Sequence, residues 1–209
     1  MTAIEDFDRY LVECPLVAII RGVAPDEVEA IGEAIFSAGI RIIEVPLNSP
    51  DPLESIKRLA ASLDGRALVG AGTVLEPQQV AEVANVGGRV IVAPNTNKAV
   101  IHAAASANMV AAPGYFTPSE AFAALESGAH ALKLFPAESA SPAVLKAQRA
   151  VLPKDTPVLV VGGIQPDNMQ PWLDAGANGF GLGSGLYVPG RSPDETAARA
   201  RAYVEGVRR

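Results

Sequence analysis

The stretch IRIIEVPLNSPDPLESIKRLAASLDGRALVGAGT, from Ile40 to Thr73, contains the pattern that decides the fold. It begins and ends with a short run, IRIIEVP and ALVGAGT, and each run is largely apolar on both of its alternating faces. Strands of this kind are typical of a parallel sheet that helices cover. Gly65 lies shortly before the second run, where a helix commonly ends. The stretch therefore predicts a strand, a helix and a second parallel strand.

Six further runs of the same kind are spread along the chain. They are VAII from Val17, VIVAPN from Val90, MVAAPG from Met109, ALKLFP from Ala131, PVLVVGG from Pro157 and GFGLGS from Gly179. Together the eight strand and helix units fill the 209 residues, and eight is the number that closes a (β/α) barrel. We therefore expect an α/β protein with a single (β/α)8 TIM-barrel domain over residues 1–209.

The structural alternative is an open, doubly wound sheet. Such a sheet usually has fewer strands and a glycine-rich dinucleotide turn after the first strand. Here VAII is followed by RGVAPDE, which lacks that turn. The barrel is therefore the favoured fold.

The segments between the runs carry signals for helix starts and ends. Prolines suited to a first helical turn are Pro25, Pro77, Pro118, Pro142, Pro166 and Pro193. Thr117 with Glu120, and Ser192 with Glu195, have the spacing of capping boxes. Glycines that precede the next run are Gly39, Gly65, Gly87, Gly128 and Gly176. An extra N-terminal helix, roughly residues 3–13, is expected to cover the bottom of the barrel.

Composition excludes several classes of protein. The chain is 49% hydrophobic with a net charge of −6, so it is not disordered and offers no extended basic surface for nucleic acid. No apolar segment approaches the ~20 residues needed to cross a membrane. The single cysteine, Cys14, cannot form an intramolecular disulfide, and the first residues do not resemble a signal peptide. These features predict a cytoplasmic protein without nucleic-acid or membrane partners.

Lys133 breaks the apolar pattern of ALKLFP. Alternation places Leu132 and Leu134 under the helices, so Lys133 is expected to point into the barrel. Burial of an ammonium group lowers its pKa toward the neutral, nucleophilic amine. The alternative is a lysine that extends to the barrel mouth or pairs with a carboxylate.

Glu44 breaks the pattern of IRIIEVP in the same way. Ile43 and Val45 take the outer face, which leaves Glu44 facing inward. A buried glutamate beside a lysine is either a structural ion pair or a general acid/base, and both interpretations stay open at this point.

Glycine clusters end the seventh and eighth runs, where barrels commonly bind phosphate. Val161, Gly162 and Gly163 form one cluster, and Gly183 and Ser184 lie in the other. Glycines let backbone N–H groups approach an anion closely, and the serine adds a hydroxyl. The alternative is that these glycines only make tight turns.

Two more polar residues are expected at the same rim. Arg21 follows the first run and Thr73 ends the third, and both types of side chain hold carboxylates or phosphates. His102 and His130 have no spacing typical of metal ligands, so no metal site is predicted.

The motifs IIEVPLNSP, LVGAGTV, VAPN, ALKLFP, VVGGI and GLGSGLY, in this order, resemble the 2-keto-3-deoxy-6-phosphogluconate/galactonate aldolases. The resemblance covers nearly the whole chain. It implies a cofactor-independent class I aldolase, typically a homotrimer, whose partners are a phosphorylated keto-deoxy sugar acid and its products, pyruvate and glyceraldehyde 3-phosphate.

The resemblance also implies roles for individual residues. Lys133 matches the Schiff-base lysine, Glu44 the general acid/base, and Thr73 a contact to the substrate carboxylate. Arg21 matches a substrate-binding arginine, with no indication of which anionic end it holds. The residues that match the phosphate site are Gly162, Gly163, Gly183 and Ser184.

Two departures from the gluconate-type pattern indicate the galactonate-type branch. Gluconate-type relatives generally carry an arginine in a segment like EVTLRT, whereas this chain reads EVPLN, ending at Asn48. They also tend to have TGG where this chain has Val161 before Gly162 and Gly163. Three alternative functions remain: an aldolase that prefers the gluconate epimer, a phosphate-binding epimerase or isomerase, and a noncatalytic phosphosugar-binding protein.

Overall fold

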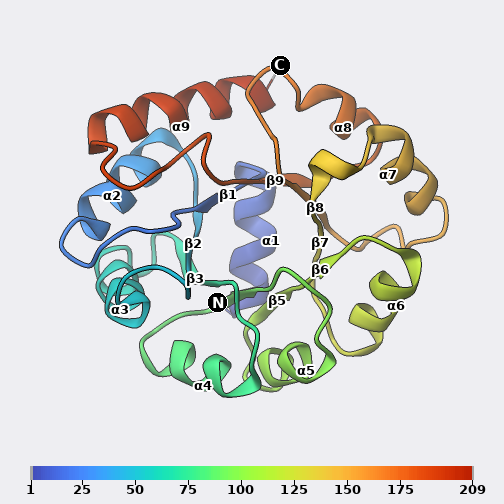
Figure 1. Ribbon diagram of the computed structural model, residues 1–209, viewed down its shortest axis with the longest axis horizontal. Helices are drawn as coiled ribbons and strands as arrows, with labels where there is room; N and C mark the ends of the chain where they lie inside the picture. Colours follow the sequence, from blue (N-terminus) through green and yellow to red (C-terminus); the bar gives the residue numbers. More distant parts are fainter. Residues whose placement is uncertain (1, 209) are drawn as a thin grey trace.

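The computed structural model describes residues 2–208, and its strands and helices alternate around a closed barrel (Figure 1). The strands are β1 Leu16–Ile19, β2 Ile42–Pro46, β3 Leu68–Gly72, β4 Val90–Val92, β5 Val110–Ala112, β6 Gly114–Tyr115, β7 Leu132–Leu134, β8 Val158–Val161 and β9 Gly179–Leu182. The helices are α1 Ala3–Glu13, α2 Val28–Ala38, α3 Pro52–Ser62, α4 Pro77–Asn85, α5 Lys98–Ser106, α6 Pro118–Glu126, α7 Pro142–Arg149, α8 Gln170–Asp174 and α9 Pro193–Val207, with a 3₁₀ turn η1 at Ala137–Ser139.

All strand pairs are parallel, in the order β5-β4-β3-β2-β1-β9-β8-β7-β6. The fifth predicted strand is divided into β5 and β6 at Pro113, which has no N–H to donate. β5 pairs with β4 and β6 pairs with β7, so this one run joins the two edges of the sheet. The Pro113 carbonyl accepts from the Lys133 N–H at 2.9 Å across the closure. The expected (β/α)8 barrel is confirmed, with its fifth strand broken.

The predicted alternation separates two apolar layers. Leu132, Leu134, Ile43 and Val45 belong to the core between the strands and the surrounding helices. Ile42 belongs to the second layer, inside the barrel. Lys133 and Glu44 are therefore directed away from the helices, as the alternation predicts.

Most predicted helix boundaries are confirmed. Helices start at Pro77, Pro118, Pro142 and Pro193, and both predicted capping boxes form. The predictions for Pro25 and Pro166 are wrong, because α2 starts at Val28 and α8 at Gln170. Pro25 lies in a turn in which the Ala24 carbonyl accepts from the Glu27 N–H at 3.2 Å, and Pro166 lies in a turn closed between Gln165 and Asn168.

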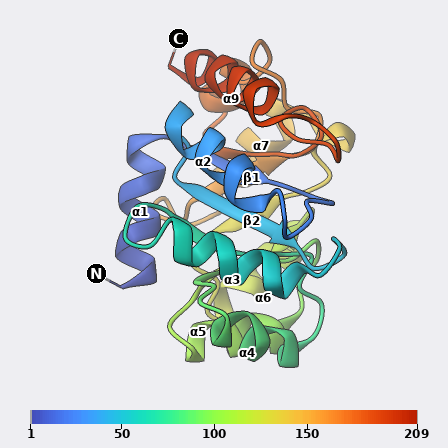
Figure 2. The same cartoon turned by 90° about the vertical axis from the view of Figure 1, so that its left-hand side faces the viewer.

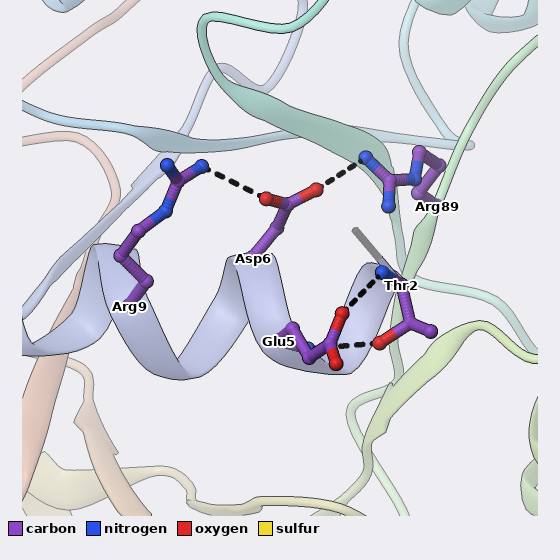
Figure 3. Close-up of polar contacts among 5 residues, drawn as sticks. All are labelled: Thr2, Glu5, Asp6, Arg9 and Arg89. Carbon is purple, nitrogen blue, oxygen red and sulfur yellow. Dashed lines mark hydrogen bonds and ion pairs between the residues drawn. The ribbon is translucent and has the colours of Figure 1, made fainter.

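Helix α1 covers one end of the barrel, as predicted for the extra N-terminal helix (Figure 2). Phe7, Tyr10 and Leu11 pack against the apolar interior of the barrel. Asp6 accepts from Arg9 at 2.8 Å and from Arg89, just before β4, at 2.7 Å (Figure 3). The helix is thus fixed to the barrel by both apolar packing and ion pairs.

No helix within residues 2–208 combines the length and the apolar character that crossing a membrane requires.

Candidate active site

Lys133 lies in the middle of β7 and lines a pocket of about 410 Å³. The residue is only 7% exposed, and its Nζ lies 4.7 Å from the centroid of the Phe135 ring. Burial lowers the pKa of this amine, and the positive charge of Arg21 lowers it further, against the opposing effect of Glu44. The pocket therefore makes the neutral, nucleophilic amine more accessible than it is for a lysine in water.

Glu44 lies in the middle of β2 and is 1% exposed. Its Oε2 atom has no hydrogen-bond partner among residues 2–208. Burial raises the pKa of the carboxyl to about 7, although the positive charges of Lys133 and Arg21 favour the carboxylate. A carboxyl group with this pKa exchanges protons readily near neutral pH.

The two groups interact electrostatically without forming a direct ion pair. Within the described chain, Lys133 Nζ and Glu44 have no ion-pair contact at 4.0 Å or less, yet each shifts the pKa of the other. The interpretation of Lys133 and Glu44 as a tight structural ion pair is therefore not supported by the geometry.

Arg21 is held at the pocket rim by residues from two neighbouring strand ends. Its Nη1 donates to Asn48 Oδ1, and both terminal nitrogens lie 3.5 Å from Thr73 Oγ1. Thr73 has a φ of 56°, an uncommon conformation for a residue with a branched side chain. The next backbone N–H, of Gly22, donates to Ser49 Oγ at 2.9 Å. These contacts orient the guanidinium beside the Thr73 hydroxyl.

The opposite wall is built by the ends of β8 and β9. Val161 is 7% exposed and belongs to the apolar layer inside the barrel, so its side chain faces the pocket and not the helices. Gly162 and Gly163 both have positive φ, at 116° and 67°. Gly183 has open space where a side chain would lie, and Ser184 also lines the pocket.

The structure brings the predicted site residues to one place. Pocket-lining residues include Arg21, Thr73, Lys133, Val161, Gly162, Gly163, Gly183 and Ser184, whereas Glu44 is buried beside the pocket. The histidines lie elsewhere: His102 is exposed on α5, and His130 Nε2 lies 2.8 Å from Asp8 Oδ1, near α1.

Sequence reasoning missed several residues at this site. Glu138 lines the pocket from η1 and lies against Gly162, and Tyr187 donates to Glu27 Oε1 at 2.6 Å. Asn48 was recognised as part of a segment that differs from the gluconate-type pattern, but its contact with Arg21 was not predicted. The signal for Glu138 was its position just after the ALKLFP strand, where a charged side chain reaches the catalytic rim of a barrel.

Comparison with known proteins adds independent findings. The family model described as KDPG and KHG aldolase matches residues 7–196. The chain is 46% identical over 200 residues to the 2-dehydro-3-deoxy-6-phosphogalactonate aldolase of Escherichia coli (strain K12), covering 96% of this chain and 98% of that protein.

Solved structures agree with the sequence match. A structure described as native KDPGal is 47% identical with a TM-score of 0.92, covering 93% of this chain and 94% of that chain. The KDPG aldolase of Legionella pneumophila, captured with pyruvate as a covalent carbinolamine, is 25% identical with a TM-score of 0.81. The match covers 93% of this chain and 96% of that chain. By its motifs, its barrel and these matches, the chain belongs to the KDPG and KHG aldolase family.

Proposed function

We propose that this protein is a class I aldolase that cleaves 2-dehydro-3-deoxy-6-phosphogalactonate to pyruvate and D-glyceraldehyde 3-phosphate through a Schiff base on Lys133. The observation that carries the proposal is a buried amine with a lowered pKa, next to a buried carboxyl with a pKa of about 7. The 46% identical Escherichia coli relative is named for this activity, and the Legionella structure holds pyruvate as a carbinolamine.

The substrate has an anion at each end, and the pocket has two matching walls. Arg21 and Thr73 contact each other, so we expect both to bind the same substrate group, which we assign as the C1 carboxylate. The C6 phosphate then takes the β8 and β9 wall, at Gly163, Gly183 and Ser184. This orientation places the C2 ketone over Lys133.

The first chemical step joins Lys133 to the substrate. Neutral Nζ attacks the C2 carbonyl carbon and forms a carbinolamine. Protonated Glu44, acting through a bridging water, gives a proton to the carbinolamine hydroxyl, which leaves as water. The product is an iminium ion, and Glu44 is left as a carboxylate.

The second step breaks the bond between C3 and C4. The Glu44 carboxylate accepts the C4 hydroxyl proton through the same relay, and C4 becomes the aldehyde carbon. The electron pair of the broken bond moves to the iminium and forms an enamine. Protonation of the enamine at C3 and hydrolysis by water release pyruvate and regenerate the free amine. All protons and electron pairs in this reaction are accounted for without a metal or an organic cofactor.

Preference for the galactonate epimer is assigned to the wall beside C4. Val161 presents methyl groups to the pocket and has no hydrogen-bonding group. A threonine at this position could hydrogen-bond a polar substrate group that has one of the two orientations at C4. Valine cannot, so the epimer with that orientation gains no hydrogen bond here.

We also infer that the protein is a cytoplasmic homotrimer. Its cysteine, Cys14, is a buried free thiol, which suits a reducing compartment. The trimer rests on the family resemblance. Light scattering should give about three times the chain mass of 21.6 kDa, and a mass near 21.6 kDa would contradict the trimer.

The experiment that tests the reaction is incubation of the purified protein with the galactonate-type 6-phosphate in the presence of a metal chelator. Release of one pyruvate per aldehyde phosphate is expected. Conversion to an epimer without cleavage would indicate the isomerase alternative. Tight binding without any reaction would indicate a noncatalytic binding protein.

A further inference from the structure

Glu138 is a second acidic side chain at the pocket, and the mechanism above does not use it. It lies in η1, five positions after Lys133 in the chain. Within the described chain it is the acidic residue that lines the pocket itself, because Glu44 is buried beside it.

The wall of the pocket is shaped around the Glu138 carboxylate. A Cβ atom at Gly162 would overlap Glu138 Oε2, and one at Gly163 would lie 2.9 Å from Glu138 Cγ. Both glycines therefore leave space for this side chain, in addition to adopting positive φ. The space over Gly162 is thus filled by a carboxylate of the chain, while the space over Gly183 is open.

Glu138 is exposed, and its oxygens accept no hydrogen bond from any group within residues 2–208, so the carboxylate is available to a ligand in the pocket that it lines. A carboxylate beside a phosphate site repels the substrate, and a hydrogen bond that it accepts from the substrate offsets this repulsion. A sugar acid supplies hydroxyl donors between its ketone and its phosphate. The Glu138 carboxylate is therefore suited to accept a hydrogen bond from a substrate hydroxyl group.

The substrate orientation proposed above indicates which hydroxyl this is. If C4 lies beside Val161 and the phosphate beside Gly163, carbon 5 lies beside the intervening Gly162, against which the Glu138 carboxylate lies. Resting on the proposed function, we propose that Glu138 is a specificity-determining residue that accepts a hydrogen bond from the C5 hydroxyl. That hydroxyl is the 2-hydroxyl of glyceraldehyde 3-phosphate.

The test is the reverse reaction, addition of pyruvate to two aldehydes. D-Glyceraldehyde 3-phosphate carries the 2-hydroxyl, and 3-phosphooxypropanal lacks it. The variant is Glu138→Gln, and the matched control is Glu126→Gln, an exposed glutamate on α6 that does not line the pocket. Borohydride trapping with pyruvate is measured for each protein.

We expect Glu138→Gln to lower kcat/KM for the hydroxylated aldehyde roughly tenfold or more, because it removes a charged acceptor. The value for 3-phosphooxypropanal should not fall, because this aldehyde has no hydroxyl for Glu138 to hold, and the pyruvate adduct should be unchanged. An equal fall for both aldehydes, or no change, would overturn the proposal. A rise for both would instead make Glu138 a repulsive competitor of the phosphate. If even the wild type forms no pyruvate adduct, the proposed function itself fails.

Discussion

The carboxylate of Glu44, on β2, occupies the space that a side chain at Gly72, at the end of the neighbouring strand β3, would fill. A Cβ atom at Gly72 would overlap both oxygens of that carboxylate. The glycine therefore creates the cavity in which the acid is buried, and burial is the main cause of its raised pKa. A glycine on β3 thus helps to set the pKa of the carboxyl group on β2.

Gly72→Ala is expected to displace the Glu44 carboxylate and lower kcat by roughly 10²-fold, because misplacement by about 1 Å is enough for such a loss. The free energy of unfolding should fall by about 1–3 kcal/mol, as for other overpacked cores. Pyruvate release and urea denaturation measure the two effects. Wild-type activity in this variant would show that the position of Glu44 is unimportant.

Glu44→Gln is expected to lower turnover by roughly 10²–10⁴-fold while the protein remains folded, because the amide keeps the size and cannot transfer the proton. Glu126→Gln serves as the control, and it should retain wild-type turnover. Normal turnover of Glu44→Gln would leave Glu44 with a structural role only.

The same variant gives a test through pH-dependent stability. The pKa of Glu44 is raised by folding from 4.5 to about 7, so the unfolded chain loses its proton at lower pH. Stability contributed by the neutral acid is therefore complete below about pH 4.5 and is lost as pH rises through 7. Relative to Glu44→Gln, the wild type should lose on the order of 2–3 kcal/mol between pH 4.5 and 8. Parallel pH profiles of the two proteins would contradict the burial of an ionisable group.

Val161→Thr tests the source of epimer preference. The wild type should cleave the galactonate-type 6-phosphate with a higher kcat/KM than the gluconate type. The added hydroxyl should shift the ratio toward the gluconate type by roughly 1–3 kcal/mol. A wild-type preference for the gluconate epimer would reject the substrate assignment. An unchanged ratio in the variant would reject Val161 as the cause.

Asp6→Ala is expected to lower the free energy of unfolding by about 1–3 kcal/mol, because it removes the nearly buried carboxylate that pairs with both Arg9 and Arg89. The expected loss is modest because both arginines are about 40% exposed and screened by solvent. Activity should be preserved, since α1 lies away from the pocket. Glu13→Ala, an exposed site on the same helix, is the control. Equal stability of the two variants would show that the ion pairs do not fix α1.

The fold and the inward direction of two residues were predictable from local pattern. A strand alternates with period two, so the apolar neighbours of Lys133 and Glu44 fix their faces without knowledge of the rest of the chain. The number of strand runs predicted the barrel, whereas the break at Pro113 depends on which partner each half of the run meets.

The unpredicted parts of the site depend on contacts between distant segments. Asn48 reaches Arg21 because β1 and β2 are neighbours, and Glu138 reaches Gly162 through the path of η1. Neither contact leaves a periodic signal in the sequence. Thr73 was predicted at the rim, but its positive φ is visible only in the structure.

The most direct test of the central claim is covalent trapping on Lys133. Incubation with pyruvate and borohydride should reduce the Schiff base to a stable secondary amine, and intact-mass analysis followed by peptide mapping locates it. Lys146 and Lys154 are exposed alternatives within the same chain. We predict one adduct per chain on Lys133 and none in Lys133→Ala. An unmodified mass, or an adduct on Lys146 or Lys154 in place of Lys133, would contradict the assignment.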